Sequence, residues 1–237
     1  YLKLPRALRE GFWSAARLLP ESRSAKNVPG RLKRFFGGGR GDFSDAYDSW
    51  ISYFGPEERA RLYASARSGA AGSAPRLPGR LDSPDDIFAY ELRNYLSDDL
   101  LCLADRVSMS NSLELRVPFL DVRLAGLLAS APLALKTRGF TLKALLKKIV
   151  AGRLPAEILS GPKRGFQVPL ARWYWEELKG FVREVLNGGS IEKNGWLSPG
   201  YIAGMLKEHE SGRRNLSDQI HSVIMFELWL ASNRKLA

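Results

Sequence analysis

The sequence predicts a mainly α-helical protein, and three observations support this class. Residue types that begin helices recur along the chain, and the apolar residues between them recur at helical spacing. Strand candidates are few, and the best of them, residues 115–119, is short and contains Pro118. No apolar run approaches the roughly 20 residues that a membrane-spanning helix needs, so the sequence predicts no membrane partner.

The first third of the chain, residues 1–82, predicts a separate group of helices. Apolar residues at helical spacing predict helices over 2–19, 43–54 and 57–67. Residues 68–80 are rich in Ser, Gly, Ala and Pro, a composition typical of a connecting segment. We therefore expect a mobile loop over 68–80 rather than a domain boundary.

Several polar residues predict the starts of the later helices. Ser83 can cap a helix whose first turn holds Pro84, and Ser97 marks a second start or a kink. Asp121 should cap a helix over 122–131, and Thr141 should cap the next.

The C-terminal part repeats these signals. Ser198 precedes Pro199 as in the earlier start, and Asn215 should begin the last helix, with Asp218 three residues on as in a capping box. Because apolar residues surround the axis of this last helix, we expect it to be deeply buried.

One segment, residues 105–121, combines charges of both signs with apolar residues. Its charged members are Asp105, Arg106, Glu114, Arg116 and Asp121. Charges buried among apolar side chains are costly unless they are paired or bind a ligand. The segment is therefore either a buried ion-pair network at a helix-to-strand junction or the wall of a binding site.

The spacing of these charges limits their arrangement. Glu114 and Arg116 lie two residues apart on a predicted extended segment, so their side chains should point the same way. They can pair with each other or with Arg106 and Asp121. Asp105 and Arg106 are neighbours on a helix and point differently, so at most one of the two should face a cleft.

Residues 105–121 resemble the synthetase-domain signature of glutamine-hydrolysing asparagine synthetases. Residues 95–101 are similar to the family's lead-in, and residues 154–170 resemble its second signature. Residues 208–214, followed by Trp229 and Leu230, resemble its closing helix. These four segments occur in the family's order and cover most of residues 83–232, whereas residues 1–82 resemble the family only faintly.

The resemblance implies the C-terminal helical portion of an α/β adenine nucleotide hydrolase-like synthetase domain, of the PP-loop ATP pyrophosphatase type. Residues 1–237 would form this part, with 1–82 a divergent helical segment and 83–237 the family-like core. The family also has a glutaminase domain with an N-terminal cysteine nucleophile and a phosphate loop that reads Ser-Gly-Gly-x-Asp-Ser. Neither is found here: Cys102 is the single cysteine, and the glycine clusters at 37–41 and 188–189 are not followed by Asp-Ser. We interpret the chain as the C-terminal part of a longer enzyme, or a cut-down form, and expect it to be inactive alone.

The activity that the resemblance implies is that of a ligase and amidotransferase in asparagine biosynthesis. ATP, accompanied by Mg²⁺, would adenylate aspartate to β-aspartyl-AMP, and ammonia from glutamine would convert this intermediate to the amide. Relatives that close β-lactam rings or lasso peptides share the domain, so another acceptor stays open. The resemblance also implies a cytoplasmic enzyme and leaves a homodimer open.

Lys163 is the predicted catalytic residue, because it matches a family lysine that contacts the pyrophosphate and the intermediate. It lies in a segment bounded by Pro162 and Gly165, a setting typical of a turn. A solvated surface lysine is the alternative. Asp105, Arg106, Glu114 and Arg116 are the predicted wall of the nucleotide and substrate site.

The remaining candidates favour structural roles. Cys102 lies among leucines and should be a small buried apolar residue rather than a nucleophile. His209 and His221 have no partners at metal-ligand spacing, so we expect no metal held by the protein. The aromatic residues 173–175 should pack in the core, with a wall of the nucleotide or ammonia route as the alternative.

The net charge of +11 comes from 36 basic and 25 acidic residues. The basic residues are scattered and accompany no nucleic-acid motif, so the sequence disfavours nucleic acid and favours a solvated basic face. Two non-enzymatic alternatives stay open: a basic helical module that binds an acidic partner or nucleic acid, and a scaffold that completes another chain's active site.

Overall fold

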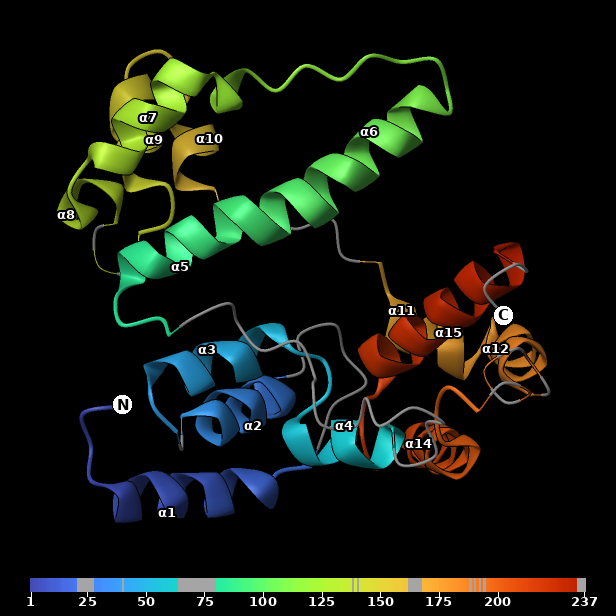
Figure 1. The fold of residues 1–237 in the computed structure, drawn as a ribbon. Helices are drawn as coiled ribbons and strands as arrows, with labels where there is room; N and C mark the ends of the chain where they lie inside the picture. The colour runs from blue at the N-terminus through green and yellow to red at the C-terminus, as the bar shows by residue number, and fades with distance from the viewer. Residues whose placement is uncertain are drawn as a thin grey trace. The chain divides into compact units, whose positions relative to one another are not determined.

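The computed structural model describes residues 1–20, 28–39, 41–63, 80–137, 139, 141–161, 168–187, 189, 191, 193 and 195–233. The described part is built from helices, and the β-bridge between Ala151 and Leu154 is isolated. The predicted mainly α class is therefore confirmed. The chain divides into two compact units, unit 1 with Tyr1–Arg80 and Phe166–Ala237, and unit 2 with Leu81–Gly165 (Figure 1).

Unit 1 contains two groups of helices that are far apart in the sequence. The N-terminal group is α1 (Arg6–Arg17), α2 (Val28–Gly38), α3 (Phe43–Ile51) and α4 (Pro56–Leu62). The C-terminal group is α11 (Leu170–Trp175), α12 (Lys179–Leu186), α14 (Pro199–Glu210) and α15 (Ser217–Ser232). The helices predicted over 2–19, 43–54 and 57–67 correspond to α1, α3 and α4, whereas α2 was not predicted. The loop predicted over 68–80 lies, except for Arg80, outside the described residues.

The core of unit 1 surrounds α15. Ile220 is fully buried, and Val223, Ile224 and Leu230 on the same helix are almost so. The residues that pack on them come from α4, α11, α12, α14 and the turns between them: Leu62, Tyr174, Val182, Ile191, Leu197, Ile202, Met205 and Leu216. Met225 and Trp229 on the other side of α15 are about half exposed, so the last helix is buried on one face and not all round.

Aromatic rings hold α1, α2 and α3 together. Phe12 of α1 stacks on Phe36 of α2 with ring centroids 5.5 Å apart, and Phe35 stacks on Trp50 of α3 at 5.6 Å. A glycine is needed where α2 meets α3, because a Cβ added at Gly38 would lie 2.9 Å from the Cβ of Ser49. The N-terminal helices therefore pack through large rings around a position that only a small residue can fill.

Unit 2 begins with one long helical rod made of three stretches, α5 (Pro84–Glu91), the π-helix η2 (Leu92–Leu101) and α6 (Cys102–Met109) (Figure 1). Ser83 caps it as predicted: its hydroxyl accepts from the backbone N–H of Asp86 at 3.2 Å. The Asp86 carboxylate in turn accepts from the Ser83 N–H at 2.8 Å. Ser97 neither starts a helix nor interrupts one, because it lies inside η2 and donates to the Arg93 carbonyl.

The rest of unit 2 consists of short helices: η3 (Pro118–Leu120), α7 (Val122–Ser130), α8 (Leu133–Lys136), α9 (Ala144–Val150) and α10 (Ala156–Ser160). Lys136 ties α8 to α5, with its Nζ 3.2 Å from the carboxylate of Asp85 and 5.5 Å from the ring centre of Phe88. Thr141 does not cap α9. Lys143 holds the N-cap position with a left-handed φ of 56°, and its side chain makes no capping bond.

The two units differ in how deeply their side chains are buried. Among the described residues of unit 2 only Leu81 is buried, and large apolar side chains such as Leu103, Phe119 and Leu127 are more than half exposed. Cys102 is half-buried rather than buried, so the expectation of a core cysteine is wrong. The described residues of unit 2 therefore lack the enclosed core that α15 gives to unit 1.

The predicted strand at 115–119 does not form. Residues 113–117 carry no regular secondary structure, and 118–120 form the 3₁₀ turn η3. A strand needs a neighbour for its backbone N–H and C=O groups, and the described residues provide none.

The central role of α15 gives a stability prediction. Ile220→Ala should lower the free energy of unfolding by about 2–5 kcal/mol, because it removes three carbons from a fully enclosed site. Met225→Ala, on the exposed side of the same helix, is the control and should cost well under half as much. Urea unfolding followed by circular dichroism measures both, and equal losses would contradict the proposed core.

Candidate functional site

The segment 105–121, which carries four of the five predicted site residues, lies in unit 2 and joins α6 to α7. Helix α6 ends in a tight turn in which the Leu113 N–H donates to the Ser108 carbonyl at 3.0 Å. Ser112 in this turn has a left-handed φ of 57°, a conformation that is uncommon for residues with a Cβ. The turn therefore directs residues 113–117 away from the axis of the rod, toward η3.

Glu114 and Arg116 form an ion pair with each other, one of the arrangements that the sequence left open. The guanidinium nitrogen of Arg116 lies 2.7 Å from the carboxylate of Glu114. The side chains are 68 % exposed for Glu114 and 83 % exposed for Arg116, so the expected buried network is wrong for this pair. A solvated pair can meet a ligand, but it contributes little to stability.

Asp121 has a structural role at the far end of the segment. Its carboxylate accepts from the backbone N–H groups of Arg123 at 3.0 Å and Leu124 at 3.3 Å, and so caps α7 as predicted. The hydrogen bond from the Arg123 side chain, followed by those from the backbone, lowers the pKa of Asp121. The carboxylate is thus held ionised at the start of the helix, where the helix dipole also favours a negative charge.

Asp105 and Arg106 lie on α6, and both side chains are exposed. Ser108 and Ser110 donate to the carbonyls of Asp105 and Val107 and so act locally in the last turn of the helix. Unit 2 thus brings Glu114 and Arg116 together and leaves Asp105 and Arg106 as separate solvated charges.

Lys163 lies outside the described residues, as does Arg164 beside it. The catalytic role of Lys163 therefore stays a prediction. The described chain resumes at Val168 and enters α11.

Residues 208–214, the closing signature, contact α4 and α12 in unit 1 through ion pairs. Arg214 lies 2.8 Å from Glu58 of α4 and 3.4 Å from Glu208, and Glu210 lies 2.8 Å from Arg183 of α12. Gly212, with φ of 74°, provides the left-handed turn that ends α14. Sequence reasoning did not identify these ion pairs, because Glu58 and Arg183 are remote in sequence.

His209 and Trp175 lie in the same region, where the indole N–H of Trp175 donates to the Glu210 carbonyl at 3.2 Å. His209 is buried at 1 % exposure, its Nδ1 accepts from the Leu216 N–H at 3.2 Å, and its ring lies 4.8 Å from that of Trp175. Tyr174 is also buried, and its hydroxyl lies 2.6 Å from Nδ1 of His221. Burial raises the pKa of Tyr174. These contacts agree with core packing.

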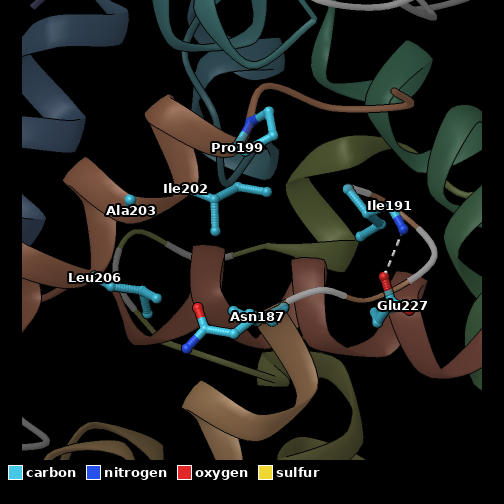
Figure 2. Close-up of a pocket in the computed structure, with 8 residues that line it drawn as sticks. Asn187, Ile191, Pro199, Ile202, Ala203, Leu206 and Glu227 are labelled. Carbon is cyan, nitrogen blue, oxygen red and sulfur yellow. Dashed lines mark hydrogen bonds between the residues drawn. The ribbon is translucent and has the colours of Figure 1, made fainter. Parts of the chain in front are cut away.

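A cavity of about 150 Å³ lies between α14 and α15 in unit 1 (Figure 2). Apolar side chains such as Ile202 and Leu206 form most of its wall, and Asn187 and the buried Glu227 add polar groups. The Glu227 carboxylate accepts from the Ile191 N–H at 2.8 Å, as Figure 2 shows. This bond gives Glu227 an anchoring role, since it attaches the turn around Ile191 to α15.

Two further properties of the described residues bear on ligands. No three His, Cys, Asp or Glu side chains among them lie together in a way that could hold a metal ion. We therefore assign none of these residues to Mg²⁺. None of the described helices has the length and apolar character needed to cross a membrane.

The chain belongs to the asparagine synthase family, whose model matches residues 3–231. This range includes the four signature segments and also residues 3–82, for which the sequence alone showed only a faint resemblance.

Two curated relatives illustrate the match. Glutamine-hydrolysing asparagine synthetase 1 of Bacillus subtilis is 32 % identical over 143 residues, which cover 60 % of this chain and 22 % of the relative. A putative glutamine-hydrolysing asparagine synthetase of Mycobacterium bovis is 28 % identical over 235 residues, which cover 96 % of this chain and 34 % of the relative. The chain thus spans between about a fifth and a third of the length of these relatives. No solved structure gave a significant match.

The exposure of the Glu114–Arg116 pair gives a second prediction. Glu114→Ala should change the free energy of unfolding by less than about 1 kcal/mol, because water already solvates both charges. Ser83→Ala, which removes the capping hydroxyl of α5 in the same unit, is the comparison and should cost about 1 kcal/mol. If chemical denaturation showed a loss of several kcal/mol for Glu114→Ala, the pair would be buried in solution.

The ion pair between Glu210 and Arg183 predicts how the stability of the protein depends on pH. The hydrogen bond from Arg183 holds the pKa of Glu210 below its usual value of 4.5. The carboxylate therefore adds stability above that usual value, and this contribution is lost as the pH falls through the lowered pKa. The urea midpoint of the native protein should fall more steeply between about pH 5 and pH 3 than that of Glu210→Gln.

The control for this titration is Glu184→Gln, since Glu184 is an exposed glutamate on α12, the helix that carries Arg183. This variant should follow the native pH dependence. Parallel curves for the native protein and Glu210→Gln would show that the ion pair with Arg183 does not persist in solution.

Proposed function

We propose that residues 1–237 form the C-terminal part of the synthetase domain of an ATP-dependent, amide-forming ligase with aspartate as the acceptor. The observation that carries this proposal is the family match over residues 3–231, which includes the signature segments that bear Lys163, Glu114 and Arg116. The relatives are named for asparagine synthesis and glutamine hydrolysis, which supports asparagine as the product and glutamine as the nitrogen source.

The proposed reaction has two steps. An oxygen of the aspartate side-chain carboxylate attacks the α-phosphorus of ATP, the bond to the β-phosphate oxygen breaks, and pyrophosphate leaves. Ammonia released from glutamine then attacks the carbonyl carbon of β-aspartyl-AMP, AMP leaves with the electron pair of the acyl C–O bond, and the nitrogen loses a proton. Negative charge therefore concentrates first on the departing pyrophosphate and then on the acyl oxygen, where fixed cations have the largest effect.

Within this proposal Lys163 supplies such a cation, and the exposed Glu114–Arg116 pair forms part of the wall that meets the nucleotide or aspartate. The exposure of Glu114 and Arg116 supports contact with a ligand, because a guanidinium and a carboxylate in water remain free to bind one. Asp105 and Arg106, exposed on α6, are the other proposed wall residues. We place this chemistry in the cytoplasm, with Mg²⁺ bound to the phosphates of ATP.

The experiment that tests the proposal is a substitution in the whole enzyme. Lys163→Ala should lower kcat for ATP- and aspartate-dependent pyrophosphate release by on the order of 10²-fold or more, as for the loss of one preorganised electrostatic donor. Glutamine hydrolysis should continue, because we assign it to a different domain. Coupled assays of pyrophosphate and of glutamate measure the two activities separately.

Lys148→Ala, at an exposed lysine of α9, is the matched control and should leave both activities unchanged. The unfolding midpoint should be the same in both variants. Near-normal synthesis by Lys163→Ala, or unfolding of that variant, would show that Lys163 has no catalytic role. If the native enzyme released no pyrophosphate with aspartate but did so with another carboxylate, that carboxylate would replace aspartate as the proposed acceptor.

A further inference from the structure

Helix α1 of unit 1 is attached to α2 along one of its sides (Figure 1). Ala16 on that side is 3 % exposed, and the ring of Trp13 lies so near α2 that a Cβ added at Gly37 would be 3.0 Å from it. The Arg9 guanidinium, also on that side, donates to the Gly39 carbonyl at 2.8 Å. These contacts fix which side of α1 faces outward.

The outward side of α1 carries only apolar residues. Successive residues of an α-helix are about 100° apart, so the exposed apolar residues of this segment share one sector of roughly 140°. They are Ala7, Leu8, Gly11, Phe12, Ala15 and Leu18. The exposed fraction is 85 % for Leu18, 53 % for Leu8 and 46 % for Phe12. A helix on the surface of a globular protein ordinarily turns polar residues to water, and this face does the reverse.

The rest of the exposed surface of α1 is basic. Arg6 and Arg17 are both exposed, with the Arg6 side chain exposed by 82 %. The acidic residue of the helix, Glu10, lies 3.9 Å from Arg6, which is a long distance for an ion pair. Residues 1–20 contain four basic residues and one acidic residue, so α1 and its flanks are positively charged. An apolar side opposite a basic side is the pattern of helices that lie in the surface of a membrane.

The charge of the chain favours an anionic lipid surface over a second copy of the chain as the partner of this face. Two copies that met through α1 would bring together two chains of net charge +11, whereas anionic lipids attract such a charge. A helix that lies on a membrane needs no apolar run of about 20 residues. The prediction of no membrane partner considered spanning helices only and does not apply to α1.

We propose that α1 attaches the protein to an anionic lipid surface. The apolar face of α1 inserts between the head groups and the acyl chains, and Arg6 and Arg17 remain at the level of the lipid phosphates. The contact is peripheral, since the helix lies along the surface and does not cross it. It is independent of the proposed ligase activity, and its test involves no substrate, so the two proposals can fail separately.

The test measures flotation of the purified full chain with vesicles of two compositions. One is phosphatidylcholine alone, and in the other phosphatidylglycerol makes up about a third of the lipid. Partitioning onto the anionic vesicles should be stronger by on the order of tenfold at low salt, and added salt should weaken it. Absence of binding to both vesicles, or equal binding to both, would overturn the proposal.

One pair of variants tests the apolar face. Leu8→Gln with Leu18→Gln should lower partitioning onto the anionic vesicles by on the order of tenfold, because both side chains insert. The matched control is Val122→Gln with Leu127→Gln, at side chains of α7 that are 86 % and 67 % exposed, and it should bind like the native chain. Leu18→Gln alone, at the most exposed leucine of the face, guards against a folding defect and should lower binding by an intermediate factor. Undiminished binding by both α1 variants would refute the site.

A second pair of variants tests the charge. Arg6→Gln with Arg17→Gln should remove most of the preference for anionic vesicles and leave weak binding to both compositions. Lys148→Gln with Arg153→Gln removes the same charge from exposed positions in unit 2 and should keep the preference. An equal loss in both double variants would show attraction by net charge alone and contradict a role for α1.

Sedimentation velocity without vesicles examines the competing partner. The native chain should sediment as a monomer, because nothing but lipid is proposed to cover α1. A dimer that disappears in the Leu8→Gln and Leu18→Gln double variant would show that a second copy covers the apolar face, and would overturn the proposal.

Discussion

The burial of one face of α15 is the constraint on which unit 1 depends. Residues from α4, near the start of the chain, and from α11, α12 and α14, near its end, meet only because Ile220, Val223, Ile224 and Leu230 require cover. The charged contacts then follow from this packing. Once α4 and α12 lie against the C-terminal helices, Glu58 reaches Arg214 and Arg183 reaches Glu210. The apolar face thus determines the fold of the unit, and the ion pairs at residues 208–214 stabilise its edges.

Unit 2 differs from unit 1 in this respect. Its helices begin at well-formed caps, but few of its described side chains are buried. Ser83 and Asp121 cap their helices with good geometry, although few of the side chains behind them are enclosed. Local hydrogen bonds can form a helix without a core, but helices in proteins gain most of their stability from packing. Many large apolar side chains among the described residues of this unit are accordingly left exposed.

Much of the fold could be predicted from the sequence, because capping acts over three or four residues. Ser83, Asp121 and Ser198 each begin a helix as expected, and their hydrogen bonds lie within that range. The prediction that Thr141 caps a helix is wrong, because α9 begins after Lys143, whose left-handed conformation no local sequence pattern indicates. The prediction for Asn215 came close: its side chain accepts from the N–H of Ser217, the first residue of α15, while Leu216 holds the N-cap position.

The candidate site was harder to predict, since it depends on remote contacts. The alternation of apolar and charged residues at 113–117 correctly places Glu114 and Arg116 together, but the strand that it suggested requires a neighbouring strand. The cost of burying charge led to the expectation of an enclosed network, whereas exposure removes that cost altogether. The contact of Arg183 with Glu210 needed three-dimensional information, because the two residues are far apart in sequence.

The π-helical stretch in the middle of the rod has a consequence for how this segment can vary. A π-helix closes its hydrogen bonds from residue i to residue i+5, so it holds more residues per turn than an α-helix. If the winding is kept, losing one residue between 92 and 101 would turn α6 about the rod axis by the angle of one residue, which is somewhat less than the roughly 100° of an α-helix. Asp105, Arg106 and the turn at Ser112 would rotate with it. The number of residues in this stretch therefore sets the direction in which the signature segment leaves the rod, and length variation should be tolerated there less than substitution.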